Sequence, residues 1–244
     1  MKKTVLVTGA SRGIGAAVAL EAAKLGYNVV VNYNKSEDRA NDIVNKARCL
    51  GADCIAVKAD VSDADEVCRM CKAAIEEFGG VDILVNNAGI SSFSLFTDIS
   101  EEMWDKTFDT NVKGAYLVTK EILPGMINKK SGRIINISSI WGICGASCEV
   151  HYSASKAALI GMTKALAKEL GPSNITVNCV APGVIDTEMN KLCDEDAMAA
   201  LCEETPLGRI GSPEEIAKTV MFLASDDAAF ITGQVISPNG GIVI

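Results

Sequence analysis

The amino-acid sequence predicts an α/β fold built on a doubly wound parallel sheet of about seven strands, with helices on both faces. Short β-branched runs alternate with longer amphipathic stretches from one end of the 244-residue chain to the other. This alternation is typical of parallel strands joined by right-handed helical crossovers. The β-branched runs are also apolar almost throughout, which indicates strands whose two faces are both covered.

The expected elements follow one another in a regular order. Strands are expected at residues 4–8, 28–33, 54–60, 81–87, 133–138, 175–182 and 234–237. Helices are expected between them at residues 14–25, 36–50, 63–78, 101–126 and 152–170. A last helix is expected to open at Ser212, because a hydroxyl N-cap there precedes Pro213 and two glutamates in the first turn.

One segment interrupts this order. Residues 186–209 are polar, lack a clear strand pattern and follow the strand at 175–182. Ligands of open α/β sheets bind beyond the carboxyl ends of the strands, so this irregular insertion is a candidate substrate lid. A surface excursion without a functional role is the alternative.

Length and composition limit the domain count and the partners. No linker, low-complexity tract or repeat divides the chain, and 48% of its residues are hydrophobic, so residues 1–244 are expected to form a single domain. The net charge of −8 disfavours nucleic acid as a partner, because phosphate binding needs a basic face. The apolar run at residues 5–7 is too short for a signal peptide or a membrane span, so no membrane association is expected.

The cysteines favour a cytoplasmic protein without disulfides or a metal site. The nine cysteines are scattered and odd in number, which indicates free thiols in a reducing compartment. Cys68 and Cys71 form a C-x-x-C pair, but they lie in a polar helical run without a second pair, so a redox or metal role is disfavoured. With His151 as the only histidine, no His-rich metal site is expected.

A glycine-rich turn follows the first expected strand. Gly9, Gly13 and Gly15 lie in the run T-G-A-S-R-G-I-G, which leads into the first helix. Glycine permits positive φ and a close approach of the backbone to a pyrophosphate, and the amides of a helix N-terminus attract the anion. The turn therefore predicts a Rossmann-type dinucleotide site, a tight turn without a ligand being the alternative.

The end of the second expected strand indicates which dinucleotide binds. Cofactors without a 2′-phosphate are commonly held by an acidic residue at this position. Residues 32–36 read N-Y-N-K-S and contain no acid, while Arg12 and Lys35 offer charges for a 2′-phosphate. NADP(H) is therefore favoured over NAD(H). Glu37 and Asp38 would weaken this argument if the strand ended later.

An ordered set of motifs spans essentially the whole chain. It comprises TGASRGIG at 8–15, D-V at 60–61, NNAG at 86–89, Asn111, Ser139, YSASK at 152–156 and P-G at 182–183. In this order the sequence resembles the short-chain dehydrogenase/reductase family. The resemblance implies an oxidoreductase that uses a nicotinamide cofactor.

The resemblance also implies which residues line the cofactor. Asp60 and Val61 are expected to hold the adenine, Ile185 and Thr187 to contact the nicotinamide end, and Asn87 to give structural support. The expected cofactor-binding residues are Gly9, Ser11, Arg12, Gly13, Ile14, Gly15, Asn32, Lys35, Asp60, Val61, Asn86, Ala88, Gly89, Tyr152, Lys156, Pro182, Gly183, Ile185 and Thr187.

Four residues are the expected catalytic set. Tyr152 and Lys156 lie four apart at a helix start and share one face, where the ammonium favours phenolate and lowers the tyrosine pKa from about 10. Tyr152 is then expected to protonate a ketone oxygen while the cofactor supplies hydride. Ser139 is expected to donate a second hydrogen bond to that oxygen. The resemblance implies that Asn111 holds a water between Lys156 and solvent. Each residue taken alone also has a non-catalytic interpretation. Asn111 would be a polar helix residue, Ser139 a turn former and Lys156 a solvated charge.

Within the family, the chain most resembles bacterial 3-oxoacyl-[acyl-carrier-protein] reductases, through PGVIDTEMN at 182–190 and ITGQVISPNGG at 231–241. This implies reduction of a 3-ketoacyl thioester in fatty-acid biosynthesis by a homotetramer. Because carrier protein and chain are both acidic, docking needs a local basic patch, for which Lys129, Lys130 and Arg133 are candidates. The loop at 171–174 lacks the basic residue that relatives often carry there.

Two alternatives to this function stay open. The run SSIWGICGASCEVHYSASK at 138–156 resembles a small group of Firmicute reductases that act on a ketone-modified lysine of elongation factor P. Both substrates are ketones on a protein arm, so the catalytic residues do not separate them. An NADP(H)-binding regulator on the same fold is the non-enzyme alternative, and the complete set of Asn111, Ser139, Tyr152 and Lys156 argues against it.

Overall fold

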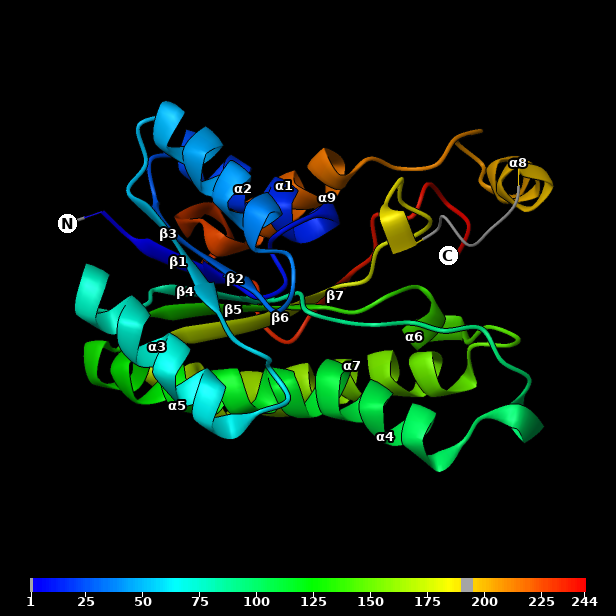
Figure 1. The fold of residues 1–244 in the computed structure, drawn as a ribbon, viewed down its shortest axis with the longest axis horizontal. Helices are drawn as coiled ribbons and strands as arrows, with labels where there is room; N and C mark the ends of the chain where they lie inside the picture. The colour runs from blue at the N-terminus through cyan, green and yellow to red at the C-terminus, as the bar shows by residue number, and fades with distance from the viewer. Residues whose placement is uncertain (1, 190–194) are drawn as a thin grey trace.

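A computed structural model describes residues 2–189 and 195–244. They form a seven-stranded parallel sheet of order β3-β2-β1-β4-β5-β6-β7 (Figure 1). The strands are β1 (Thr4–Val7), β2 (Asn28–Tyr33), β3 (Cys54–Lys58), β4 (Ile83–Asn86), β5 (Gly132–Ile137), β6 (Ile175–Val180) and β7 (Val235–Ile236). The order reverses between β1 and β4, which creates the crevice where doubly wound sheets bind ligands. The predicted fold class is confirmed.

In most of the central strands, apolar and polar residues do not alternate along the sequence. Every residue of β1, β4, β5 and β6 is buried, so each strand is covered on both faces. Several strands end before the expected position, as at residues 59–60, 87 and 181–182. Those residues leave the sheet at its carboxyl edge and form the turns that carry the candidate site.

Two layers of helices cover the sheet (Figure 1). On one face lie α1 (Gly13–Lys24), α2 (Glu37–Cys49) and α9 (Pro213–Ala224), and on the other α3 (Ala64–Phe78), α5 (Gly114–Lys129) and α7 (Val150–Leu170). The α9 helix begins with the predicted cap, since Ser212 and Glu215 form a reciprocal capping box. Among the described residues, no helix is long and apolar enough to cross a membrane.

The helix expected at 101–126 is two helices joined by a π-helical turn. The α4 helix spans Glu101–Phe108, the π-helical turn spans Asp109–Lys113, and α5 continues from there. A π-helical turn holds an extra residue and re-aims the side chains around it, and such turns are frequent at functional sites. Within this turn Asn111 is 1% exposed, whereas the side chains of Asp109 and Lys113 are about half exposed and pair with each other.

Two helices at the carboxyl edge of the sheet were not predicted. The expected irregular segment at 186–209 contains α8 (Glu195–Glu204), which Figure 1 shows beyond the carboxyl ends of the strands. A short helix, α6 (Trp141–Cys144), follows β5. The segment after β6 pairs back on the start of α9, because Asp186 N donates to Gly211 O at 2.9 Å and Gly211 N donates to Val184 O at 2.9 Å.

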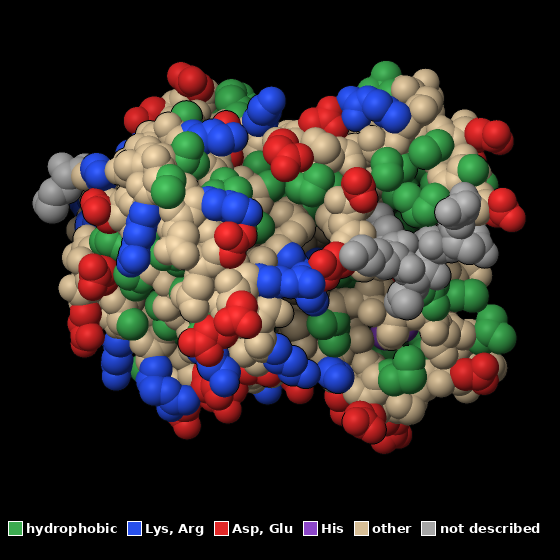
Figure 2. All heavy atoms as spheres, turned by 45° about the horizontal axis from the view of Figure 1, so that its top comes forward, with side chains coloured by type: hydrophobic (Ala, Val, Ile, Leu, Met, Phe, Trp, Pro, Cys, Tyr) green, Lys and Arg blue, Asp and Glu red, His purple; other side chains and the backbone are tan. Residues whose placement is uncertain are grey.

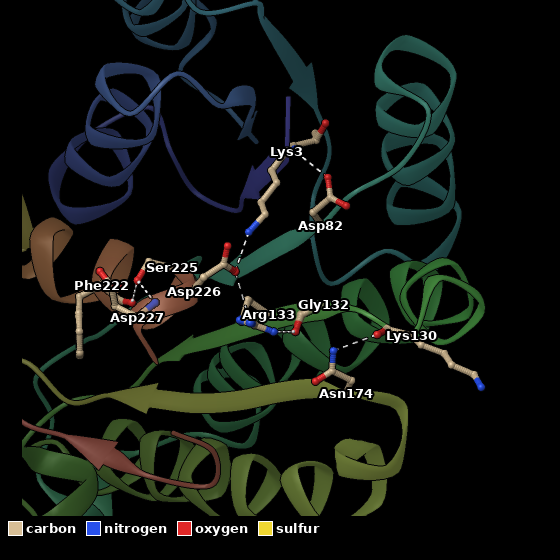
Figure 3. A network of polar contacts seen from close by, with 11 residues as sticks. Lys3, Asp82, Lys130, Gly132, Arg133, Asn174, Phe222, Ser225, Asp226 and Asp227 are labelled. Carbon is tan, nitrogen blue, oxygen red and sulfur yellow. Dashed lines mark hydrogen bonds and ion pairs between the residues drawn. The ribbon is translucent and has the colours of Figure 1, made fainter. Parts of the chain in front are cut away.

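A polar network ties elements together at the opposite, amino edge of the sheet (Figure 3). Lys3 Nζ donates to Asp226 Oδ1 at 2.9 Å, and Arg133 Nη2 lies 3.7 Å from the same oxygen. Lys129 Nζ donates to Asp82 Oδ1 at 3.0 Å. Of the three candidates for a basic docking patch, Arg133 is 9% exposed and Lys129 is paired with Asp82, whereas Lys130 is exposed. A docking patch at this edge stays a prediction.

Candidate active site

A cavity of about 280 Å³ opens at the carboxyl ends of β4, β5 and β6. Its walls come from the start of α1, the loop after β4, the end of β5, the start of α7 and the segment after β6. The predicted site residues that line it are Ile14, Gly89, Ser139, Tyr152, Lys156, Pro182, Gly183, Ile185 and Thr187. The molecular surface is hollowed on this side, and basic and acidic side chains both border the hollow (Figure 2).

The glycine turn leaves the N-terminus of α1 open to an anion. Arg12 is its N-cap residue, and no side chain caps the backbone amides there, whereas side chains do cap α3, α4 and α9. Gly9 has a φ of +62°, and a Cβ at this position would lie 2.9 Å from Ala88 Cα. The chain therefore fits a dinucleotide whose pyrophosphate takes the place of a side-chain cap.

The expected adenine end lies where β2 and β3 finish. Asp60 accepts hydrogen bonds from Ser62 N at 2.9 Å, Ser62 Oγ at 2.6 Å and Asn34 Nδ2 at 2.8 Å. Burial raises the pKa of Asp60, but these hydrogen bonds and the charge of Lys35 outweigh burial and hold the pKa below its usual value. Asp60 is therefore an ionised, fixed group, and Val61 beside it is buried.

Two of the predicted cofactor residues turn their side chains into the protein. Asn32 Oδ1 accepts a hydrogen bond from Gly9 N at 3.0 Å, and Asn32 Nδ2 donates to Ala59 O at 3.0 Å. Asn86 Nδ2 donates to Asn136 Oδ1 at 2.9 Å, within the layer between the sheet and α7. Both amides therefore support neighbouring backbone or side chains, and neither lines the cavity.

Asn87 joins the loop after β4 to the glycine turn, in agreement with the structural role expected for it. Its Nδ2 donates to Thr8 O at 2.9 Å and to Gly9 O at 3.1 Å. Thr8 Oγ1 in turn accepts from Ala88 N at 3.0 Å. These bonds fix the two loops that would hold the cofactor relative to each other.

Tyr152 and Ser139 converge on the cavity from α7 and from the end of β5. Tyr152 is 7% exposed and Ser139 is 8% exposed. Burial raises the pKa of Tyr152; a side-chain hydrogen bond with Ser139 lowers it, and the charge of Glu149 raises it further. The net direction is upward, so the expected lowering of the Tyr152 pKa is wrong for this structure. The physical reason is that the buried phenolate loses its hydration.

The Lys156 side chain is buried beside the Tyr152 ring. Its Nζ lies 5.6 Å from the ring centroid and donates to Ile137 O at 2.8 Å. The two side chains thus share the helix face that their spacing predicts. Burial lowers the pKa of Lys156 to about 8. The ammonium is held by a backbone carbonyl, and its attraction for a phenolate does not offset the burial of Tyr152.

Asn111 lies behind Lys156, outside the cavity lining. Its Oδ1 accepts from Ile90 N at 2.8 Å, and its Nδ2 donates to Ile90 O at 3.0 Å and to Ser155 Oγ at 2.9 Å. A Cβ on Gly89 would lie 3.2 Å from Lys156 Nζ and 3.3 Å from Asn111 Oδ1. The ammonium and the amide therefore approach the same point, and the water-holding role of Asn111 stays a prediction.

Three charged residues around this site were not predicted from the sequence: Glu149, Glu188 and Arg39. Glu149 lines the cavity and is 6% exposed; its signal was the acid in the S-C-E-V run that precedes Tyr152. Glu188, after β6, pairs with Arg39 Nη1 of α2 at 2.6 Å and with Arg12 Nη1 of the glycine turn at 3.4 Å. No local sequence pattern predicts the ion pairs of Glu188, because only the fold brings the segment after β6 next to Arg12 and Arg39.

The C-x-x-C pair takes no part in the site. The cysteines of the described chain are free, Cys71 being buried in α3 and Cys68 partly exposed. Burial raises the pKa of Cys71 to about 12. A thiol this weakly acidic is a poor nucleophile at neutral pH.

Comparison with known proteins gives the same family throughout. A family model described as "Enoyl-(Acyl carrier protein) reductase" matches residues 9–243. The 3-oxoacyl-[acyl-carrier-protein] reductase FabG of Staphylococcus epidermidis is 46% identical over 242 residues, 99% of each chain. The 3-oxoacyl-[acyl-carrier-protein] reductase of Synechocystis sp. is 45% identical over 99% of this chain and 97% of its own. FabG of Thermotoga maritima is 41% identical over 99% and 98%. The chain belongs to the short-chain dehydrogenase/reductase family of oxidoreductases.

Proposed function

We propose that this protein is an NADPH-dependent ketone reductase whose first candidate substrate is a 3-oxoacyl thioester on an acyl carrier protein. One observation carries the proposal: Ser139, Tyr152 and Lys156 converge on a cavity that adjoins the open N-terminus of α1. The names of the relatives support the choice of thioester, since they are 3-oxoacyl-[acyl-carrier-protein] reductases at 41% to 46% identity. We propose that the whole chain forms this one catalytic domain and acts in the cytoplasm.

The chemistry follows from the protonation states of the buried residues. The glycine turn at Gly9, Gly13 and Gly15 would hold a nicotinamide cofactor, which would supply hydride chemistry at the carbonyl carbon. Tyr152, which burial keeps protonated, donates its phenol proton to the carbonyl oxygen. This proton transfer is favourable even from a weakly acidic phenol, because the alkoxide formed on reduction is far more basic than a phenolate. Ser139 donates a hydrogen bond to the same oxygen as its negative charge develops.

Lys156 and Asn111 support this transfer from behind Tyr152. The Lys156 ammonium, charged below about pH 8, lies over the Tyr152 ring and stabilises the phenolate left after proton donation. Asn111 is a positioning residue that ties the loop after β4 to α7 beside Lys156 Nζ. In this proposal, a water held by Asn111 returns the proton to Tyr152 through Lys156.

The preference for NADP(H) rests on the charges near the end of β2. The strand ends at Tyr33, and Lys35 follows it as an exposed cation beside Asp60. Arg12 and Arg39 are two further cations at this side, and both reach Glu188. A 2′-phosphate is a dianion that guanidinium groups bind with paired hydrogen bonds. These residues support NADP(H) over NAD(H).

A second candidate substrate is the ketone-modified lysine of elongation factor P. The buried carboxylate of Glu149 in the cavity favours it, because an uncharged acyl thioester offers no cation to a buried acid, whereas a modified lysine brings its own nitrogen. The Tyr152 chemistry is the same for both ketones. The partner protein and the group next to the ketone are what distinguish them.

The test compares NADPH oxidation with acetoacetyl carrier protein and with ketone-modified elongation factor. We expect Tyr152→Phe to lower the rate on the preferred substrate by at least about 100-fold, because the ring keeps its packing but loses the proton. Tyr116→Phe is the matched control, since Tyr116 is a tyrosine of α5 that is 49% exposed. An unchanged rate in Tyr152→Phe would remove the proposed proton donor. Cofactor binding without turnover of either ketone would favour the regulator.

We also propose a homotetramer, in line with the family. Large apolar side chains on α5, on α9 and near the C-terminus support it, because they are exposed in the single chain: Tyr116, Ile127, Phe222, Phe230, Ile236 and Ile244. Contacts between subunits would remove such exposed apolar side chains from water. Light scattering after size-exclusion chromatography measures the assembly, and a monomer would contradict the proposal.

A further inference from the structure

Glu149 is a buried acid inside the cavity that the proposed mechanism does not use. It is the N-cap residue of α7 and lies three residues before Tyr152. Its residue is 6% exposed, and it lines the same cavity as Tyr152, Lys156 and Ser139. A glutamate this deeply buried is unusual unless a partner compensates for the loss of water.

Contacts with the loop after β4 fix the position of Glu149. Ser91 Oγ donates to Glu149 Oε1 at 2.5 Å. On either side, Ser94 N donates to the backbone oxygen of Cys148 at 2.8 Å, and Ser92 Oγ lies 2.8 Å from His151 Nε2. Three successive contacts therefore fasten this loop to the start of α7. The Glu149 carboxylate is a positioned group and not a surface side chain that folded inward by chance.

Within the part of the chain that the structure describes, the charge of Glu149 has no cation as a partner. Across residues 2–189 and 195–244, Ser91 is the only hydrogen-bond partner of its carboxylate, and no ion pair includes it. Lys156, a cation that lines the same cavity, donates to Ile137 O instead. Burial raises the pKa of Glu149, and the hydrogen bond from Ser91 lowers it, with a net upward direction. A buried carboxylate without a cation is costly, and a cation that arrived with the substrate would remove that cost.

The cavity around Glu149 strengthens such a pair. Trp141 and Phe93 line the same space and are bulky and apolar. Attraction between opposite charges is stronger where water is excluded than at the open surface. A neutral acyl chain would leave the carboxylate without a partner, whereas an ammonium group would pair with it and keep its other side against the aromatic rings.

We propose that Glu149 is a specificity-determining residue that binds a protonated nitrogen of the substrate, so that the enzyme reduces ketones carrying an ammonium group in addition to uncharged oxoacyl thioesters. The inference rests on the proposed ketone reduction. Reduction of an ammonium-bearing ketone has the same stoichiometry as reduction of an oxoacyl thioester. The carbonyl carbon takes hydride from the nicotinamide cofactor, which is oxidised, and the carbonyl oxygen takes the Tyr152 proton. The ammonium group remains unchanged and only positions the ketone.

The test uses two methyl ketones of the same shape. One ends, three methylenes from the carbonyl, in a dimethylamino group that is protonated at neutral pH, and the other ends in an isopropyl group. The quantity measured is the ratio of kcat/KM for the amino ketone to that for the neutral ketone. We expect a ratio of at least about tenfold in the wild type, because hydrogen bonds to charged groups are stronger than those between neutral groups.

Glu149→Gln removes the charge while keeping the side-chain volume and an oxygen for Ser91. We expect this variant to bring the ratio to about one, and Glu149→Asp to retain a preference for the amino ketone. Glu76→Gln, an exposed residue of α3, is the matched control for the loss of one negative charge. Isothermal calorimetry with the amino ketone gives a second readout: binding should weaken in Glu149→Gln and not in Glu76→Gln.

The possible outcomes separate this inference from the proposed function. Equal kcat/KM for the two ketones in the wild type, or the same ratio in wild type and Glu149→Gln, would overturn the role of Glu149 while leaving ketone reduction in place. Turnover of neither ketone, nor of acetoacetyl carrier protein, would overturn the proposed reduction itself and the inference with it.

Discussion

Burial sets the protonation states of Tyr152 and Lys156 in a useful combination. It raises the pKa of Tyr152 and lowers that of Lys156 to about 8, because each charged form loses its hydration. At neutral pH the phenol is therefore protonated, and most of the lysine is still charged. The Tyr152 phenol thus has a proton to donate, and the Lys156 ammonium has a charge that stabilises the phenolate left after donation.

This arrangement predicts a pH limit on ketone reduction. We expect kcat/KM to fall as the pH rises through about 8, because the buried Lys156 then loses its proton. Lys156→Met should lower kcat/KM at neutral pH by roughly 100-fold and remove this fall. Initial rates of NADPH oxidation from pH 6 to pH 10 measure it, with the exposed Lys120→Met as control. The same fall in Lys156→Met would show that another group titrates.

The sequence predicts which residues belong to the site better than it predicts the directions in which their side chains point. The spacing of Tyr152 and Lys156 on one helix was enough to predict that they meet, as the 5.6 Å between ammonium and ring shows. Asn32 and Asn86 were expected to line the cofactor; their side-chain amides turn inward, and a contact between these residues and a cofactor stays a prediction. Strands buried on both faces lack the alternation that would tell one side from the other.

At the scale of elements, the strands and the long helices were predictable because their apolar patterns are strong. The π-helical turn at Asp109–Lys113 was not, since one extra residue shifts the phase of a helix without interrupting its composition. The α8 helix was missed because Glu195–Glu204 is short and lies in a polar segment. Such segments are stabilised by tertiary contacts more than by their own periodicity.

The segment after β6 predicts an effect on cofactor choice. Glu188 pairs with Arg12 and Arg39, the guanidinium groups that a 2′-phosphate would need. We expect Glu188→Gln to bind NADPH about two- to fivefold more tightly, because exposed ion pairs contribute up to about 1 kcal/mol each. The affinity for NADH should stay unchanged.

Fluorescence titration of both cofactors measures this difference. Glu169→Gln, at an exposed position of α7, removes the same charge away from the pairs. Weaker NADPH binding in Glu188→Gln, or equal tightening for both cofactors, would show that Glu188 does not compete with a 2′-phosphate.

At the scale of the whole molecule, the carboxyl edge of the sheet carries the candidate active site, and the amino edge contributes to stability. The carboxyl edge carries the cavity, and the amino edge carries the polar network around Asp226 (Figure 3). Lys3 in front of β1 and Arg133 of β5 both reach this carboxylate. Substitutions at the amino edge should therefore change stability without changing the chemistry.

Asp226→Asn tests this separation. The hydrogen bond and charge of Lys3 hold the pKa of Asp226 below 3.8, so its stabilisation is present above that pH and is lost as the pH falls through the lowered pKa. The side chain is 79% exposed, so we expect a loss of less than about 1 kcal/mol at pH 7 and a smaller loss near pH 3. Urea denaturation at both pH values measures it. A change in kcat/KM would contradict the separation of the two edges.

Asn86 and Asn136 favour one alignment of the central strands β4 and β5. They stand opposite each other in the register, and Asn136 Nδ2 reaches Thr163 Oγ1 of α7 at 2.8 Å. A shift of one strand by a single residue would turn its asparagine side chain towards the apolar layer beneath α1 and α9. A buried polar group without a hydrogen-bond partner there costs roughly 1 to 3 kcal/mol of stability. The pair therefore favours the observed register, which places the carboxyl ends of β4 and β5 side by side at the nucleotide crevice.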